Sequence, residues 1–230
     1  MNITSRDKVG EIAAHHPMAT QVFSRHGIDF CCGGGVELQE ACTKQGLSTP
    51  EVLGEIEQAL SVQDPDLVRW DEAPVAELIR HIVQAYHFPL REELPRLESM
   101  ARKVARVHGD KDPVRLGDLL RTFLSLKAEL DDHMDREEEV LFPAILQHGN
   151  TDGLPISTFI DDHAEAGQAL ARLRELTGDY RVPDRACNTW RALWHGLEAL
   201  ERSLHLHIHL ENNVLFPKLR ATNGAEAPSL

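Results

Sequence analysis

Two copies of a histidine and glutamate motif carry the residue types and spacing best suited to chemistry in this chain. His133 precedes Glu137 by four positions, and His207 precedes Glu211 by the same spacing. After three further residues, each glutamate is followed by Leu-Phe-Pro. Side chains four positions apart lie on one face of a helix, so each pair can bind a common partner.

Both pairs lie on the apolar face of the helix that carries them. This face carries Leu119, Phe123, Leu126 and Leu130 before the first pair, and Trp190, Trp194, Leu197, Leu200 and Leu204 before the second. An unpaired carboxylate on a buried face costs on the order of several kcal/mol. We therefore expect a positive partner beside each glutamate.

The same periodicity adds one histidine from each of two further helices. His87 continues the apolar face that carries Val83, and His163 continues the face that carries Ile160. The expected inward set is His87, His133, Glu137, His163, His207 and Glu211. Histidines and glutamates from four helices are typical of a carboxylate-bridged pair of metal ions. Nitrogen and oxygen donors without thiolate favour iron or manganese over structural zinc.

The ligand on the first long helix has an alternative. Pro89 lacks a backbone donor and follows His87 by two residues, so it is expected to kink or interrupt the helix. If the helix breaks earlier, His81 takes the place of His87 as a ligand.

The alternative to a metal site is that the buried histidine and glutamate pairs bond each other without metal. Two further histidines do not join the expected set. His205 and His209 lie about 200° around the helix from His207, at about 100° per residue. They continue a polar row that contains Glu198, Glu201 and Arg202. We predict that both are solvated.

Two acidic residues next to the expected ligands are candidates for outer partners. Glu129 lies one turn before His133, and Asp162 immediately precedes His163. Both acids are predicted to orient imidazoles or to line an exit path for iron. The alternative is that they are exposed acids in helices rich in acids.

A pair of adjacent cysteines, Cys31 and Cys32, lies in a glycine-rich turn near the start of the chain. A disulfide between neighbours closes a small strained ring and is easily reduced, which disfavours a purely structural role. We predict that the pair captures iron or nitric oxide through thiolate, or passes a redox signal to the helices that follow.

The elements that must position these residues are helices. Four long amphipathic segments are expected at about 75–107, 115–147, 156–176 and 187–220. Short connections between them favour an all-α, up-down-up-down four-helix bundle, preceded by a small helical domain. The predicted bounds are 1–62 for the small domain, 63–74 for a linker, 75–220 for the bundle and 221–230 for a tail.

The charge and composition exclude several classes of function. The net charge is −13, from 24 basic and 37 acidic residues, so we expect neither nucleic acid nor an anionic membrane as a partner. The start of the chain lacks the apolar core of a secretory signal, and no stretch reaches the roughly 20 apolar residues of a membrane span. A cytoplasmic location is expected, where most thiols stay reduced.

Two parts of this pattern resemble known families. The set from His87 to Glu211 resembles the hemerythrin-like domains. The run Phe30-Cys31-Cys32-Gly33-Gly34-Gly35 resembles the cysteine-bearing domain that precedes them in the repair-of-iron-centres family. The resemblance spans almost the whole chain. A histidine and glutamate repeat alone indicates only some hemerythrin relative, whereas its combination with the cysteine pair is specific.

The resemblance implies a bacterial protein with two non-haem iron ions that restores iron-sulfur clusters damaged by nitric oxide or oxidative stress, by donating iron. It implies damaged or apo iron-sulfur proteins as partners, with nitric oxide or oxygen as small ligands. The glutamates would bridge the irons, and the four histidines would be terminal ligands. Oxygen-carrying hemerythrins have a further histidine where this chain has Gly167, and this departure favours more labile irons.

Two other functions stay open at this point. The first is a di-iron reductase of nitric oxide or peroxide, since two adjacent irons can bind and couple small oxidants. The second is a sensor in which binding of oxygen or nitric oxide to the irons moves the small domain. Many turnovers per site would distinguish the enzyme from a carrier. The sequence also leaves open whether the chain forms a homodimer.

Overall fold

The computed structural model describes residues 3–61, 67–149 and 153–223, and within these ranges every regular element is a helix. An isolated antiparallel bridge joins Lys8 to Glu37. No helix among the described residues is long and apolar enough to cross a membrane. The all-α prediction is confirmed. Parts of the predicted linker and tail, 62–66 and 224–230, lie outside the described residues.

The chain divides into two compact units. The first contains Met1–Arg80, Leu146–Gly153 and His205–Leu230, and the second contains His81–Ile145 and Leu154–Leu204. The domain bounds derived from the sequence stay a prediction.

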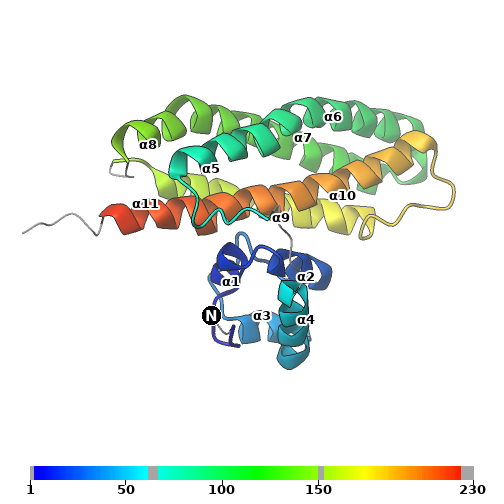
Figure 1. Ribbon diagram of the computed structural model, residues 1–230. Coiled ribbons are helices and arrows are strands. Elements are labelled where there is room, and N and C mark those ends of the chain that lie inside the picture. The colour runs from blue at the N-terminus through cyan, green and yellow to red at the C-terminus, as the bar shows by residue number, and fades with distance from the viewer. Residues whose placement is uncertain (1–2, 62–66, 150–152, 224–230) are drawn as a thin grey trace, which may run out of the picture. The chain divides into compact units, whose positions relative to one another are not determined.

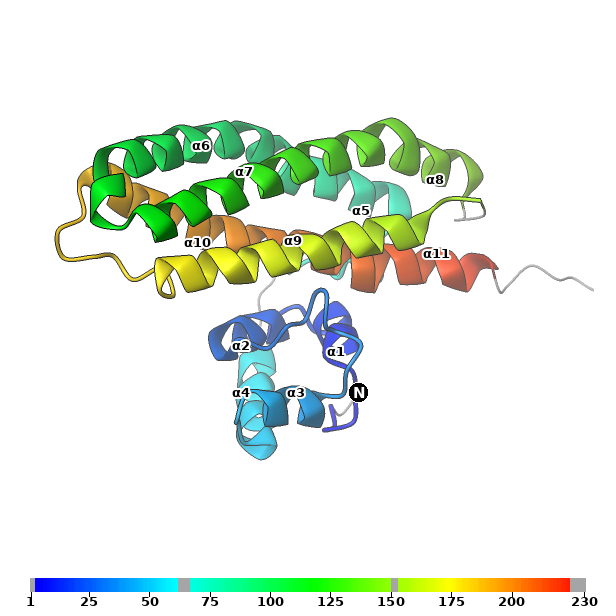
Figure 2. The same ribbon diagram turned by 180° about the vertical axis from the view of Figure 1, so that it is seen from behind.

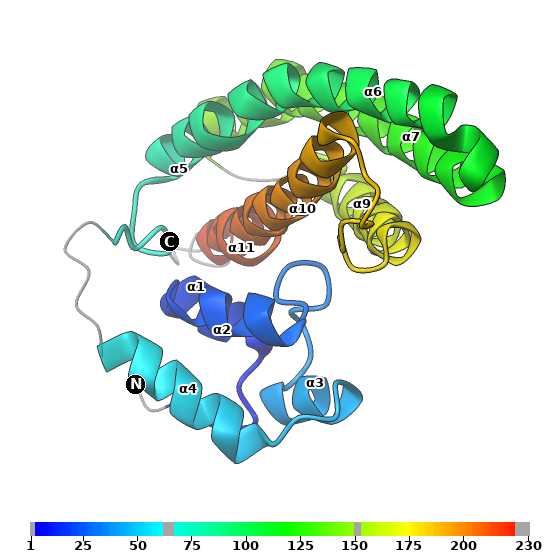
Figure 3. The ribbon, with the colours of Figure 1, turned by 90° about the vertical axis from the view of Figure 1, so that its right-hand side faces the viewer.

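The first unit begins with four short helices: α1 (Val9–His15), α2 (Ala19–His26), α3 (Leu38–Lys44) and α4 (Thr49–Ser61). Pro17 separates α1 from α2, and α2 ends at Gly27, whose φ of 65° is left-handed and favours glycine. These helices are arranged around a common centre (Figure 3), and their buried apolar side chains form one core. Its buried members include Val9, Ile12, Val22, Phe23, Phe30, Leu38, Val52 and Ile56.

The first unit also contains most of α5 (Val75–Ile82), the π-helical turn η4 (Leu210–Leu215) and α11 (Phe216–Asn223). Asp71 joins several of these parts. Its carboxylate accepts hydrogen bonds from Arg69 at 2.6 and 2.8 Å and lies 2.9 Å from His15 Nδ1. Its carbonyl accepts from Lys218 Nζ at 2.6 Å. Burial alone would raise the pKa of Asp71, but the bonds from Arg69 and His15 lower it to about 2.

We expect Asp71→Asn to destabilise the protein at neutral pH and to have a smaller effect in acid. Because the pKa in the folded protein is below the ordinary value of 3.8, the charge stabilises the fold above that pH, and this contribution is lost as the pH falls toward about 2. Urea unfolding of both proteins at about pH 7 and about pH 3 measures the effect. An equal difference in unfolding free energy at both pH values would contradict the assignment.

The second unit is built from four long helical segments: η1 (Val83–His87) with α6 (Phe88–His108), α7 (Pro113–Arg136) with η3 (Glu137–Leu141), α9 (Ile156–Thr177), and most of α10 (Asn188–His209). The segments run alternately up and down, as predicted (Figure 1). Figure 2 shows α7 and α9 side by side along their length. The short elements η2 (Gly109–Lys111) and α8 (Phe142–His148) follow α6 and η3.

The core of the second unit follows the apolar faces that the sequence predicts. Fully buried side chains include Leu94, Leu97, Leu116, Phe123, Leu126, Leu173, Leu193 and Trp194. The N-terminus of α7 is capped by Asp112, whose carboxylate accepts from the Arg115 amide, and Pro113 occupies the first turn. Burial of these large side chains holds the four segments together.

Within the described parts of the chain, three π-helical turns interrupt the long helices, and each precedes a Phe-Pro pair. The amide of Phe88 donates to the carbonyl of Val83, that of Phe142 to Glu137, and that of Phe216 to Glu211. Each of these bonds spans five residues rather than four. A wider turn gives room for the proline ring, which would clash in a regular helix. Pro89 therefore does not break the helix before His87, because the π turn absorbs it.

Candidate metal centre

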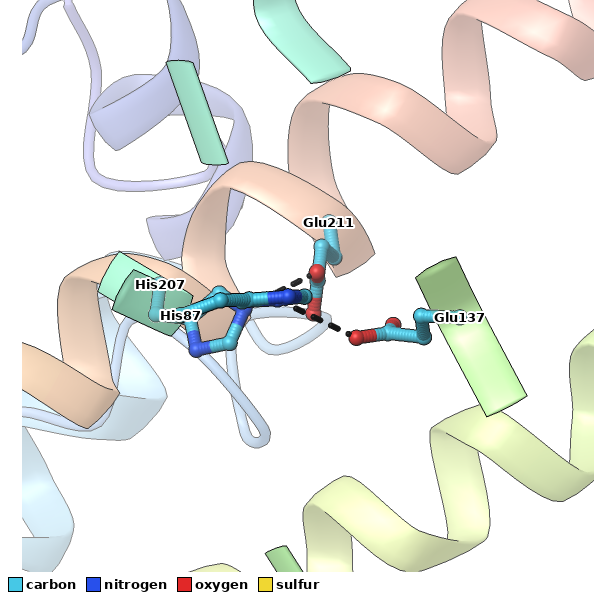
Figure 4. A group of neighbouring side chains, drawn as sticks. All are labelled: His87, Glu137, His207 and Glu211. Carbon is cyan, nitrogen blue, oxygen red and sulfur yellow. Dashed lines mark hydrogen bonds and ion pairs between the residues drawn. The ribbon is translucent and has the colours of Figure 1, made fainter. Parts of the chain in front are cut away.

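The structure brings the six residues of the expected inward set into two overlapping groups. His87, Glu137, His207 and Glu211 form one group, and His133, Glu137, His163 and Glu211 form the other. Within each group, one ligand atom per residue lies within 4.8 Å of every other. Figure 4 shows the side chains of the first group pointing toward one another. Both groups share the same two glutamates.

The imidazole Nε2 atoms face the shared carboxylates. His87 Nε2 lies 3.3 Å from Glu137 Oε2, and His133 Nε2 lies 3.3 Å from Glu137 Oε1. One carboxylate thus presents a different oxygen to each group. His207 Nε2 lies 3.0 Å from Glu211 Oε1. The Nε2 atoms of His133 and His163 are 3.0 Å apart, so both rings converge on one point.

Three of the six residues in these groups lie in π turns. His87 is the last residue of η1, Glu137 is the first of η3, and Glu211 is the second of η4. A π turn shifts the register of all side chains that follow it relative to a regular helix. Such turns are rare and occur frequently at functional sites. The recurring Phe-Pro pairs are the sequence signal that marks them.

Carboxylates contact two of the histidines at Nδ1, the ring nitrogen opposite the Nε2 that faces the shared glutamates. His87 Nδ1 lies 3.0 Å from Glu138 Oε1, and His133 Nδ1 lies 3.0 Å from Asp162 Oδ2. A carboxylate at Nδ1 fixes the tautomer of the ring, so that the lone pair of Nε2 points toward the shared glutamates.

Each of these carboxylates is in turn bonded by an arginine. Arg91 donates to Glu138 at 3.0 Å, and Arg136 donates to Asp162 at 2.7 Å. Burial alone would raise the pKa of Asp162, but the bonds from Arg136 and His133 lower it, so the carboxylate stays charged at neutral pH. In both arrangements an arginine contacts a carboxylate, and the carboxylate contacts a histidine.

The donor set fits a bridged pair of divalent metal ions. Glu137 and Glu211 are both 0% exposed, and the four histidines are no more than 4% exposed. Two carboxylates buried this deeply need positive charge beside them. Each group offers two imidazole nitrogens and two carboxylate oxygens, which suit iron, manganese or zinc, and sharing of both glutamates suits bridging.

The other predicted site residues lie at different distances from these groups. His81 belongs to neither group among the described residues, and its ring stands edge-on to Tyr86. Asp162 contacts the expected ligand on α7 rather than its own neighbour His163. Glu129 is exposed and accepts a hydrogen bond from Ser125, so the structure does not bring it to the cluster.

The sequence missed Glu138, because its partner His87 lies on another long helix and 51 positions away. The only signal was its place in the acidic run Glu137-Glu138-Glu139.

The prediction that His209 is solvated was wrong. Its side chain is 4% exposed, and burial lowers its pKa to about 4. The reason is a contact within the first unit, where His209 Nδ1 lies 3.3 Å from the carbonyl of Phe30.

The cysteine pair lies in the loop between α2 and α3. Cys31 is buried and Cys32 is partly exposed, and their sulfur atoms lie 3.8 Å apart without a disulfide bond. A hydrogen bond with Cys32 and burial raise the pKa of the Cys31 thiol above its usual range, so Cys31 keeps its proton at neutral pH. Cys32 is the more exposed residue of the pair.

Comparison with known proteins gives two family matches and close relatives. The hemerythrin HHE cation binding domain matches residues 78–219, and a domain of unknown function (DUF542) matches residues 5–60. The chain is 42% identical to the iron-sulfur cluster repair protein YtfE of Pectobacterium atrosepticum, over 91% of this chain and 95% of the relative. It is 40% identical to YtfE of Escherichia coli O1:K1, over 93% and 96%. It is 37% identical to the iron-sulfur cluster repair protein ScdA of Staphylococcus haemolyticus, over 94% and 99%.

Proposed function

Because the chain belongs to the hemerythrin-like family of iron-sulfur cluster repair proteins, we propose that it binds two iron ions and donates iron to damaged iron-sulfur proteins. The observation that carries the proposal is the sharing of Glu137 and Glu211 by both donor groups. In this assignment the two glutamates bridge the irons. His87 and His207 complete one site, and His133 and His163 complete the other.

The chemistry of the donors supports a site that releases its cargo. Each group supplies four nitrogen and oxygen donors, and an iron ion that prefers six ligands keeps open positions beside them. Iron-sulfur proteins hold iron through cysteine thiolates. Thiolate and sulfide ligands in the recipient therefore compete well with imidazole and carboxylate in the donor.

The residues of this chain contribute three further properties. The glutamates and histidines are buried, so water and competing ions have restricted access. Glu138 and Asp162 hold the rings of His87 and His133 with Nε2 facing the site. Release of iron leaves two buried carboxylates close together, and proton uptake at the site offsets their charge.

An anaerobic transfer experiment tests the proposed function. The iron-loaded protein is mixed with an apo iron-sulfur protein, sulfide and a thiol, and cluster formation is followed by visible absorbance while iron left on the donor is measured. We expect cluster formation to match the iron lost by the donor, and a donor without iron to give none. Retention of the iron, or consumption of nitric oxide or peroxide over many turnovers per site, would contradict a donor role.

A further inference from the structure

We propose that Asn213 couples metal binding at Glu211 to the reactivity of the Cys31 and Cys32 thiols. The inference rests on the proposed di-iron site. Glu211 and Asn213 both lie in the π turn η4 of the first unit. The Asn213 Nδ2 atom donates to the carbonyl of Phe30 at 3.2 Å and to that of Cys31 at 3.1 Å. A single amide thus joins the metal-binding turn to the peptides of the cysteine pair.

The cysteine loop is built to present these carbonyls. The carboxylate of Asp29 accepts from the amides of Cys31 and Cys32 at 3.0 Å each, and from that of Gly33 at 2.9 Å. Three amides that point to one carboxylate fix the orientation of their peptides. The carbonyls of Phe30 and Cys31 remain for Asn213.

The cysteine loop is also packed tightly against α1. A movement of η4 is therefore expected to move the loop as well. The amide of Gly10 donates to the carbonyl of Gly34 at 2.8 Å. A Cβ atom on Gly34 would lie 2.8 Å from the carbonyl oxygen of Phe30 and 2.9 Å from Gly10 Cα, and one on Gly10 would clash with Asn213 Oδ1. The two glycines let α1, the loop and η4 approach this closely.

A second contact supports the same link. The ring of His209, one residue before η4, lies with its centroid 5.5 Å from that of Phe30, and its Nδ1 lies 3.3 Å from the Phe30 carbonyl. Phe30 itself is 1% exposed and belongs to the core of the first unit. The residue before the cysteine pair is therefore fixed both by side-chain packing and by its carbonyl.

The physical consequence follows from linkage. A metal ion on Glu211 restrains the backbone of η4, and Asn213, two residues on, then holds the loop in the closed arrangement in which Cys31 is buried. Without metal, η4 and the loop open more often, and the thiols are exposed more often. Coupling of this kind is reciprocal, so modification of the thiols should in turn weaken metal binding.

The test compares thiol alkylation in metal-free protein and in protein loaded anaerobically with Fe²⁺. Iodoacetamide labelling of Cys31 and Cys32 is followed by mass spectrometry, and bound iron is measured in the same samples. We expect loading to slow alkylation of the pair at least about fivefold in the wild type. In Asn213→Ala the rates with and without iron should agree, while iron still binds. Asn212→Ala, which removes the same side chain from the same turn, should keep the wild-type ratio.

Each other outcome has a distinct meaning. Iron bound to the wild type with equal alkylation rates would overturn the coupling alone. Protection by iron that persists in Asn213→Ala would overturn it as well, because the thiols themselves would then hold the metal. Absence of bound iron would overturn the proposed function and this inference with it. If Asn213→Ala does not fold, Asn213→Leu takes its place, because leucine keeps the size of the side chain but lacks the Nδ2 donor to the carbonyls of Phe30 and Cys31.

Discussion

Replacement of Glu211 by leucine is expected to remove both metal ions from the protein rather than one. Glu211 belongs to both donor groups, so its loss takes one ligand from each ion and removes negative charge that holds them together. Leucine fills a similar buried volume without offering a donor. Elemental analysis should show a fall from two ions per chain to nearly none. The optical spectrum of a carboxylate-bridged pair should disappear with it.

Two variants serve as controls for the bridging role. His163 belongs to only one of the two groups. The His163→Ala variant should therefore lose the ion of that group and retain the ion of the other group. Glu201 is a buried glutamate on α10, paired with Arg174 at 2.8 Å, and among the described residues it belongs to neither group. Glu201→Leu makes the same substitution and should keep both ions. Loss of a single ion from Glu211→Leu would show that this glutamate does not bridge.

The sequence predicted that the six residues of the two groups face the bundle interior because each lies on the apolar face of its own helix. The period of the helix is a property of one segment, so His133 and Glu137, or His207 and Glu211, can be placed inward without knowledge of the other helices. Burial of all six residues agrees with that argument. His81 was an alternative to His87 because Pro89 can either break a helix or be accommodated by a wider turn. The sequence does not distinguish these two effects.

The sequence did not predict contacts between segments far apart in the chain. Asp162 was expected to act near His163, its neighbour, but its partner His133 lies on α7. The charged residues in the row that contains His209 predict that this face of α10 is exposed to solvent. In the first unit the cysteine loop covers that position, and the carbonyl of Phe30 replaces water. Neither a lateral partner nor a covering loop leaves a periodic signal.

Replacement of Asp162 by asparagine is expected to weaken metal binding by about 10- to 100-fold without removing any ligand. Asparagine keeps the size of the side chain but removes the negative charge that His133 Nδ1 and Arg136 share. The imidazole then loses both its fixed orientation and the carboxylate that makes Nε2 a stronger donor. Competition with a chelator of known affinity measures the loss, and unfolding of the metal-free protein shows whether the fold is intact.

The comparison that decides this prediction uses the matched arrangement on the other side of the site. Glu138→Gln removes the carboxylate behind His87 and should weaken binding to a similar degree, while acting on the other ion. Asp135→Asn is the control, because Asp135 accepts from Arg91 at 2.7 Å and, within the described ranges, belongs to neither group and pairs with none of their histidines. If Asp135→Asn weakened metal binding as much as Asp162→Asn, the effect would come from surface charge rather than from the held imidazole. A loss confined to Asp162→Asn and Glu138→Gln assigns it to the carboxylates behind the two histidines.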